Sequence, residues 1–557
     1  MKRSWLIVPL TMLATACSKM PPPELPSPPP PALNENVPPP PPPPPPPVMA
    51  APRSPMLKVS PNIVVTASRV QGGLRFVPHP VADRERYDGK EVAAVKRVAT
   101  DPVSTFSVDV DTGSYANSRR FLSGGALPPQ DAVRTEEMLN YFRYDYPAPI
   151  DRARPFTVST DVSLTPWNPA TRLLRIGIRG YDITRAERPA ANLVFLVDVS
   201  GSMNMPDKLP LVKTALAGLA DRLTKRDRVS VVVYAGAAGV VLDPTNDPAK
   251  IKAALDSLSA GGSTAGGEGI ALAYAIARAN RIPDGINRVL LATDGDFNVG
   301  ITDSKQLEDM IARNRDDGIT LTTLGFGQGN YNEAMMERVA DVGNGNYAYI
   351  DSAIEAHKVL GDELSSTLFT IAKDVKIQIE FNPAEISEYR LIGYENRALA
   401  EEDFNNDKVD AGDIGAGHQV TAIYEIVPAG AKGWFPDRRY DANQVAAGAA
   451  RGQTEVAWLK LRYKLPNARV SQLIEQPVTR ALLASAAPPR GDMAFATAVA
   501  AFGQHLRGDT YLGGFTYGDI KRLAGRQSDY ARGEFLKLVE LAEALTPADA
   551  AVKAGGD

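Results

Sequence analysis

The stretch NLVFLVDVSGSM, residues 192–203, is an apolar run that ends abruptly in oxygen-bearing side chains. Leu193 to Val197 is apolar at every position, as in a parallel strand that is covered on both faces of its sheet. Asp198, Ser200 and Ser202 follow on alternate positions, which places their side chains on one side of an extended chain. The pattern predicts a central strand whose end carries a group of oxygen ligands.

Helical and strand patterns alternate from this strand to about residue 368. Apolar residues at three- and four-residue steps predict a helix with one buried face, and these are Leu209, Val212, Leu216, Leu219 and Leu223. Further strands are predicted at RVSVVVYA (228–235), NRVLLATDG (287–295) and ITLTTLGFG (319–327), with helical segments between them. This order is typical of a doubly wound α/β domain with a mainly parallel sheet.

Two more polar signals follow predicted elements of this domain. Thr264 lies in the glycine-rich loop GGSTAGGEG (261–269), and Asp294 ends a second strongly apolar strand. Ligands of doubly wound domains bind beyond the carboxyl ends of the strands, where Asp198, Ser200 and Ser202 are also expected. Hydroxyl and carboxylate oxygens suit a hard divalent cation such as Mg²⁺. The sequence therefore predicts that these oxygen-bearing side chains gather at one edge of the sheet.

The order Asp-x-Ser-x-Ser, then Thr, then Asp resembles the metal-ion-dependent adhesion site of von Willebrand factor type A domains. The resemblance implies that Ser200 and Ser202 are direct ligands of Mg²⁺, or of Mn²⁺ or Ca²⁺ in its place. It implies that Thr264 ligates directly in the bound state and through water otherwise. Asp198 and Asp294 are expected to hold coordinated waters. The implied partner is a protein that offers an acidic side chain to the metal.

A wider resemblance covers residues 101 to 545. The segments STFSVDVDTGSYANSRRFL (104–122), EEMLNYFRYDYP (136–147) and AGDIGAGHQVTAIYEIVP (411–428) are similar to the bacterial YfbK-type von Willebrand A lipoproteins. The implied fold class is α/β: a doubly wound, mainly parallel, Rossmann-like type A domain. Alternating segments from DVKIQIEF (374–381) onward predict that a β-sandwich-like region and a C-terminal helical segment flank it.

The N-terminus reads as a targeting segment. Lys2 and Arg3 precede a short apolar run, which ends in LATAC at Cys17, the only cysteine. This resembles the lipobox of bacterial lipoproteins, and an ordinary cleaved signal peptide is the alternative. Ser18 after the cysteine favours a lipid anchor in the outer membrane of a Gram-negative bacterium, on its periplasmic side or its surface. Membrane attachment through lipidated Cys17 is the resulting expectation.

The residues that follow predict a stiff tether. Pro38 to Pro47 is an unbroken proline run, which adopts extended polyproline II and cannot form a core. Within the tether, NIVVTASRV (Asn62 to Val70) resembles an element near the start of TonB-dependent transporters. We interpret it either as a segment that docks on the sheet edge of another protein or as a plain linker strand.

Five regions are expected from these patterns. They are a lipoprotein signal peptide (1–17), a proline-rich disordered tether (18–100), an N-terminal family segment whose strands join the β-region (101–190), the type A domain (191–368) and a C-terminal β-rich, then helical region (369–557).

Composition narrows the function classes. A formal net charge of −4 and a pI near 5.8 argue against a nucleic-acid partner. A protein-binding module that depends on a divalent metal is favoured over an enzyme. The alternative hydrolase, with Asp198 as nucleophile, needs a general acid or base near the metal, and only Glu268 and Asp296 lie close in sequence. A structural assembly scaffold with a merely stabilising metal is the other alternative.

Overall fold

The computed structural model describes residues 85–547, except 109, 185, 263–265, 296–303, 364–365, 367, 410 and 437–453. Cys17, Thr264, Asp296 and the segment Asn62–Val70 lie outside the described residues. All described residues belong to one compact unit, which spans Pro78–Asp557. In the part of the chain that is described, no helix is both long and apolar enough to cross a membrane.

The type A domain contains a six-stranded sheet in the order β10-β9-β8-β5-β6-β7. Neighbouring strands are parallel except β7, which pairs antiparallel with β6 at one edge. The strands are β5 (Ala191–Asp198), β6 (Arg228–Tyr234), β7 (Ala238–Thr245), β8 (Ile286–Thr293), β9 (Thr320–Phe326) and β10 (Tyr347–Ile350). The helices are α3 (Leu209–Ala220), α4 (Pro248–Ser257), α5 (Gly266–Ala279), α6 (Ser304–Asp316), α7 (Glu333–Val342) and α8 (Ala353–His357).

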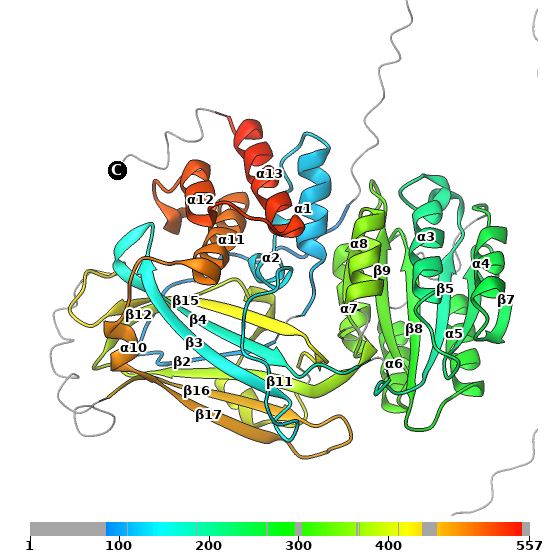
Figure 1. Ribbon diagram of the computed structural model, residues 1–557, viewed down its shortest axis with the longest axis horizontal. Coiled ribbons are helices and arrows are strands. Elements are labelled where there is room, and N and C mark those ends of the chain that lie inside the picture. Colours follow the sequence, from blue (N-terminus) through cyan, green and yellow to red (C-terminus); the bar gives the residue numbers. More distant parts are fainter. Residues whose placement is uncertain are drawn as a thin grey trace, which may run out of the picture. The chain divides into compact units, whose positions relative to one another are not determined.

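Helices cover both faces of this sheet (Figure 1). Alternate residues of β5 point to opposite faces: Phe195 packs in a cluster with α3 and α4, and Leu196 packs in a cluster with α5 and α6. This explains why β5 is apolar at every position between its ends. Helix α3 ends at Ala220, so Leu223 of the predicted helical face lies beyond the helix end and is only partly buried.

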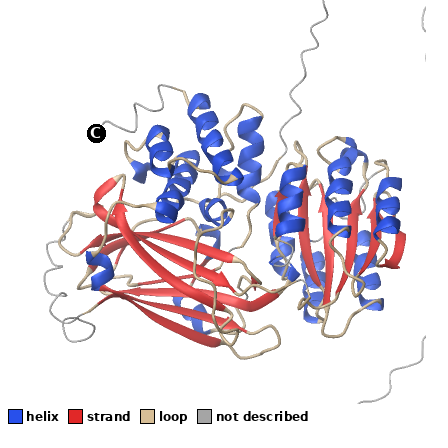
Figure 2. Ribbon diagram, viewed as in Figure 1, coloured by secondary structure: helices blue, strands red, loops and turns tan. Residues whose placement is uncertain are grey.

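Two sheets form a β-sandwich outside the type A domain (Figure 2). One has the order β1-β12-β15-β4-β3 and the other β13-β2-β11-β16-β17, with β14 on β11. The first contains β1 (Lys96–Arg97), β12 (Ile386–Ile392), β15 (Gln419–Pro428), β4 (Asn168–Gly180) and β3 (Phe156–Thr165). The second contains β13 (Ala398–Leu399), β2 (Val103–Ser107), β11 (Thr370–Phe381), β14 (Ile414–Gly415), β16 (Glu455–Lys464) and β17 (Gln472–Thr479). Strands that precede the type A domain thus pair with strands that follow it.

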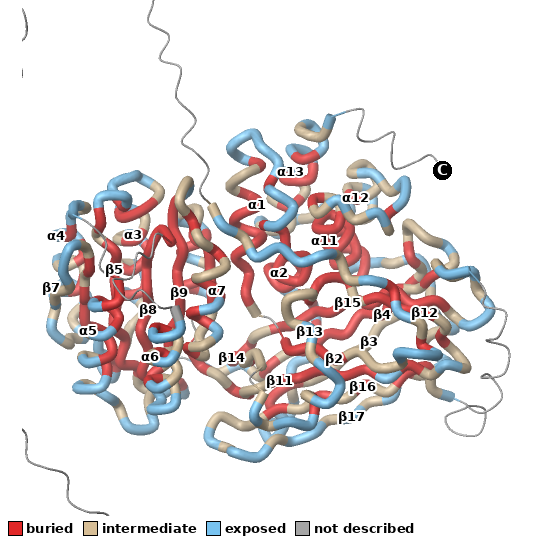
Figure 3. Tube along the Cα trace, turned by 180° about the vertical axis from the view of Figure 1, so that it is seen from behind, coloured by how far each residue is buried: buried red, intermediate tan, exposed pale blue. Residues whose placement is uncertain are grey.

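A helical layer covers the outer face of the first sheet (Figure 3). It combines α1 and α2 from the N-terminal side with α11, α12 and α13 from the C-terminal side, and their apolar residues share one core with Leu173 of β4 and Ile423 of β15. The helices outside the type A domain are α1 (Gly113–Ser123), α2 (Thr135–Asn140), α10 (Arg480–Ala484), α11 (Gly491–Arg507), α12 (Tyr517–Ala524) and α13 (Tyr530–Leu545). The predicted C-terminal helical segment is therefore half of a layer drawn from both ends of the chain.

Buried arginines join this layer to the type A domain. Arg134, which directly precedes α2, lies 2.7 Å from a carboxylate oxygen of Glu333 and 2.7 Å from one of Glu337, both on α7. Arg119 of α1 lies 2.6 Å from Asp351 and 2.7 Å from Glu355, at the start of α8. These four carboxylates of the type A domain are thus paired by guanidinium groups from outside it.

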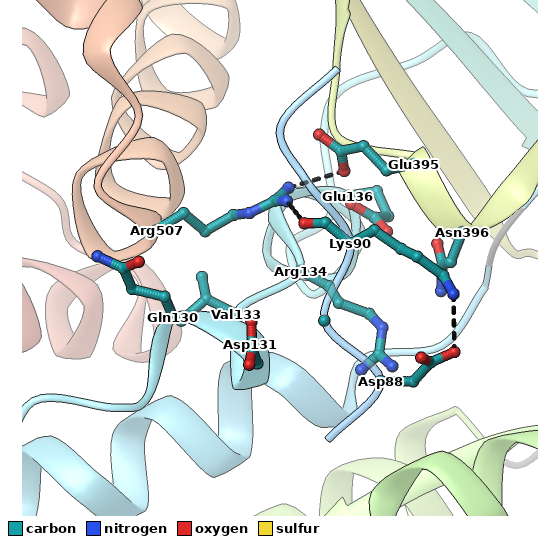
Figure 4. Close-up of a pocket in the computed structure, with 11 residues that line it drawn as sticks. Asp88, Lys90, Gln130, Asp131, Val133, Arg134, Glu136, Glu395, Asn396 and Arg507 are labelled. Atoms are coloured by element: carbon teal, nitrogen blue, oxygen red, sulfur yellow. Dashed lines mark hydrogen bonds and ion pairs between the residues drawn. The ribbon is translucent and has the colours of Figure 1, made fainter. Parts of the chain in front are cut away.

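The tether was expected to continue to residue 100, but residues 85–100 pack on the folded body. Strand β1 pairs antiparallel with β12, and Arg507 of α11 donates to the carbonyl of Lys90 at 2.7 Å and to Glu395 at 2.7 Å (Figure 4). Arg86 forms a parallel bridge with Asn332 in the type A domain. Much of this attachment uses backbone groups, which leave no hydrophobic period in the sequence, so the sequence placed the start of the body near residue 101.

Candidate functional site

Two carboxylates lie at the carboxyl edge of the type A sheet. Asp198 is the last residue of β5, and Asp294 directly follows the neighbouring parallel strand β8. Both residues are fully buried. The sheet topology therefore brings together two acidic residues that are far apart in the sequence.

The two serines lie in the loop that follows β5. The backbone N–H of Ser200 donates to Oδ1 of Asp198 at 2.8 Å, which turns the chain sharply after the strand. The hydroxyl oxygens of Ser200 and Ser202 are 3.0 Å apart. Ser200 is buried and Ser202 is exposed. Two ligands in neighbouring positions of an octahedron, each about 2.1 Å from Mg²⁺, lie roughly 3.0 Å apart, so the spacing of the hydroxyls fits a shared cation.

The loop that leads to Thr264 is bonded to the serine loop. Gly261 N–H donates to the Val199 carbonyl at 2.8 Å, and Gly201 N–H donates to the Gly262 carbonyl at 3.1 Å. Gly262 has a φ of +87°, a left-handed conformation that favours glycine. The backbone directly before residue 263 is thus attached to the segment that carries Ser200 and Ser202.

Burial destabilises the charged form of the Asp198 carboxyl. It raises the pKa of the Asp198 carboxyl to about 6, although the N–H of Ser200 opposes the rise, and the nearby Asp294 carboxylate adds to it. The Thr293 hydroxyl donates to Oδ2 of Asp198 at 3.1 Å. Two adjacent buried carboxylates create a need for positive charge at this edge of the sheet.

Lys208 and Asn330 are site residues that sequence analysis did not identify. The Lys208 ammonium lies 2.9 Å from Oδ2 of Asp294 and 3.0 Å from Oδ1 of Asn330. The Asn330 amide donates to the same Asp294 oxygen at 3.2 Å. A lysine directly before a helix shows no sign of burial in the sequence. A local signal that could have found it is the glycine pattern GFGQG (325–329), because the stem of Lys208 passes directly over Gly327.

The described donor set fits a hard cation. Within the described residues, no group of three or more His, Cys, Asp or Glu side chains is placed to hold a metal ion. The oxygen donors described at this edge include the hydroxyls of Ser200 and Ser202 and the carboxylates of Asp198 and Asp294, and such oxygens suit Mg²⁺ or Mn²⁺ better than Zn²⁺.

The three described histidines have their contacts elsewhere. His357 lies 2.8 Å from the Arg222 guanidinium, and His505 contacts the Phe515 carbonyl. His418 is buried in the sandwich region, where burial lowers the pKa of its imidazole to about 3. A cavity of about 240 Å³ lies elsewhere and is lined by residues of β1, β2, β12 and β13 and their flanking segments. The described residues thus supply no imidazole to the candidate metal site.

Three family models match the chain. The one described as "von Willebrand factor type A domain" matches residues 192–362, "von Willebrand factor" matches 81–175, and "Uncharacterized protein YfbK, C-terminal" matches 366–545. Together they extend over both halves of the sandwich, the helical layer and the type A domain. The predicted α/β von Willebrand A fold is confirmed.

Relatives extend the likeness to most of the chain. Uncharacterized protein YfbK of Escherichia coli is 48% identical over 473 residues, which are 83% of this chain and 81% of that protein. Uncharacterized protein sll0103 of Synechocystis sp. is 33% identical over 33% of this chain and 43% of its own length. A solved structure described as von Willebrand factor type A from Catenulispora acidiphila covers 74% of this chain and 91% of its own, with 17% identity and a TM-score of 0.37. The names of these relatives specify no enzymatic activity. Because 48% of the aligned residues are identical over 83% of this chain and 81% of YfbK, the chain belongs to the YfbK-like family of proteins with a von Willebrand factor type A domain.

Proposed function

We propose that this protein is a protein-binding module of the cell envelope and that its type A domain captures a partner through a divalent cation. Asp198, Ser200, Ser202, Thr264 and Asp294 would hold the ion, which is Mg²⁺ or Mn²⁺. The observation that carries the proposal is the pair of serine hydroxyls 3.0 Å apart, with the buried Asp198 and Asp294 behind them. A von Willebrand A fold supports a role in protein interaction or adhesion.

The donor set supports an acidic group on the partner. Direct ligation by neutral serine hydroxyls leaves most of the positive charge of a dication uncompensated, so Mg²⁺ bound there supplies a coordination position that attracts a carboxylate. Ser202 is exposed, while Asp198 is buried. The serine side of the site therefore faces a partner, while the aspartates hold the ion from inside.

An enzymatic role receives less support from the same residues. A metal-dependent hydrolase needs a general acid or base within hydrogen-bond reach of its substrate. The described histidines contact other elements, and Lys208, the cation nearest to Asp294, is buried. We therefore propose a non-enzymatic function.

Anchoring completes the proposal. Cys17 would carry the lipid in the outer membrane, and the proline-rich residues after it would hold the folded body away from the membrane surface. Residues Asn62–Val70 would dock on the sheet edge of another protein.

The decisive experiment measures metal binding before any partner is known. Calorimetric titration of the folded protein with Mg²⁺ and Mn²⁺ should show one site, and Ser202→Ala should weaken it. Ser257→Ala is the matched control, because Ser257 is an exposed serine at the end of α4. Absence of any binding to the wild type would contradict the proposal.

A second stage tests the partner. Crosslinking in intact cells should capture a protein when Mg²⁺ is present, and chelator or Ser202→Ala should abolish the capture without a change in melting temperature. Capture that continues equally in chelator would indicate an ordinary surface interaction instead.

A further inference from the structure

We infer that Lys208 is a resident cation of the metal site: its ammonium neutralises Asp294 and competes with the divalent cation for that carboxylate. The inference rests on the proposed function in one respect, namely that a metal binds beside Asp198 and Asp294. It adds a residue that opposes the metal, whereas the residues named so far would hold it.

The contact between Lys208 and Asp294 is buried. The two side chains are 5% and 0% exposed, and their charged atoms are 2.9 Å apart. Asn330 lies against both groups, since it accepts a hydrogen bond from the ammonium and donates one to the carboxylate. A charge-assisted pair that is removed from water and bridged by a third polar group differs from an exposed pair, which salt and solvent screen.

The backbone holds the lysine in this position. Lys208 is the residue before α3, with φ −117° and ψ −114°, and its N–H donates to the Met205 carbonyl at 3.0 Å. Its aliphatic stem crosses Gly327 so closely that a Cβ at residue 327 would lie 2.3 Å from Cγ of Lys208. Gly327 has a φ of +74°, and its carbonyl accepts a hydrogen bond from the Tyr349 hydroxyl at 2.6 Å. The ammonium is therefore directed to Asp294 by packing along the whole side chain.

The charge balance explains what this lysine does. Asp198 and Asp294 carry a formal charge of −2, and Lys208 reduces the sum to −1. An ammonium and a dication that approach the same carboxylate repel each other strongly where water is excluded. The contact of Asp294 with the ammonium therefore lowers its affinity for the divalent cation, so Lys208 weakens metal binding.

The same pair stabilises the metal-free protein. A buried carboxylate without a counter-ion is strongly destabilising, and the ammonium supplies that counter-ion at Asp294 whether or not a metal is bound. We thus expect a protein that stays folded without metal and binds Mg²⁺ only moderately.

The test is Lys208→Met, which keeps most of the apolar stem over Gly327 and removes the charge. The affinity for Mg²⁺ and for Mn²⁺, measured by calorimetry, should rise by about tenfold or more because like-charge repulsion is relieved. In chelator the melting temperature should fall, and the rise in melting temperature on adding Mg²⁺ should exceed that of the wild type. If Lys208→Met fails to fold without metal, Lys208→Gln provides the same comparison with a neutral group that can still donate to Asp294.

Two controls separate this effect from a general loss of stability. Lys464→Met removes a partly buried lysine that pairs with Asp374 at 2.6 Å in the sandwich, and it should lower stability without a change in metal affinity. In an Asp294→Asn background, Lys208→Met should lose most of its effect on metal affinity, because the shared carboxylate is gone.

The outcomes distinguish the inference from the proposed function. If the wild type binds Mg²⁺ and Lys208→Met binds it equally or more weakly, the inference is overturned and the metal site stands. If neither protein binds Mg²⁺ or Mn²⁺, the proposed function and the inference both fail. If only Lys208→Met binds, the inference holds in its strongest form, with the ammonium replacing the metal, and the proposed function is overturned.

Discussion

Asp227→Asn tests the electrostatics at the edge of the sheet opposite to the candidate metal site. The Asp227 carboxylate accepts two hydrogen bonds from the Arg188 guanidinium, one from Ala191 N–H at 2.9 Å, and two from the N–H and hydroxyl of Thr224 at 2.6 and 2.8 Å. It therefore connects the amino ends of β5 and β6 through one side chain.

The magnitude follows from burial and from the number of donors. Asp227 and Arg188 are 0% and 4% exposed, so solvent does not screen the pair. Asparagine retains one acceptor oxygen but places an NH₂ group against the remaining donors, and it leaves Arg188 buried without its counter-ion. Breaking a buried pair in this way costs about 3–5 kcal/mol of the free energy of unfolding at pH 7.

The pH dependence gives a second test of the same contact. Burial by itself raises the pKa of the Asp227 carboxyl, but the hydrogen bonds from Arg188, Thr224 and Ala191 outweigh it, and the pKa lies below its ordinary value. The stabilisation is therefore present above the unfolded pKa of about 3.9 and is lost as the pH falls through the lower folded pKa. The difference between wild type and Asp227→Asn should shrink below about pH 4.

Urea unfolding followed by circular dichroism measures both effects. Asp221→Asn is the control, because Asp221 pairs with Lys252 in an exposed contact, and it should change stability by less than about 1 kcal/mol. The Mg²⁺ affinity of Asp227→Asn should equal that of the wild type, since the contact lies at the other end of the strands. A loss below about 1 kcal/mol at pH 7, or a difference that persists undiminished in acid, would refute the reasoning.

Three further predictions concern other parts of the chain. Gly327→Ala should destabilise the protein by at least about 1 kcal/mol in urea unfolding, because φ is +74° and the new Cβ would collide with Lys208; an unchanged midpoint would contradict this. Arg134→Met removes the guanidinium that pairs with the buried Glu333 and that also contacts Glu337 of α7, and it should cost about 3–5 kcal/mol, with faster limited proteolysis as the independent readout. Cys17→Ser should move the protein from the membrane fraction to the soluble fraction, and a wild type that is already soluble after signal cleavage would exclude the lipid anchor.

Hydrophobic period alone predicts most of the type A domain. Strand β5 is apolar on both faces because helices cover both, and α3 repeats its apolar residues at helical steps. These signals involve residues that are close together in the sequence, so they can be recognised without knowledge of the fold. The edge strand β7 was not predicted, because its residues are mostly half-exposed and show no clear alternation.

The candidate site likewise contains residues that the sequence predicts and residues that it does not. The expectation that Asp198 and Asp294 lie close together needed only the rule that parallel strands end at one edge. Lys208 could not be assigned, because its role depends on Asp294, 86 residues away, and on a glycine in another loop.

The sequence by itself determined the α/β class, the position of the oxygen donors and the alternation of the sandwich strands. Only the tertiary structure showed that the helical layer combines segments from before and after the type A domain, that residues 85–100 pack on the body, and that the buried Lys208 pairs with Asp294. The physical reason is that hydrophobic periodicity shows which face of a helix or strand is buried. Backbone bridges and buried ion pairs instead depend on how loops that are distant in the sequence are placed in the folded protein.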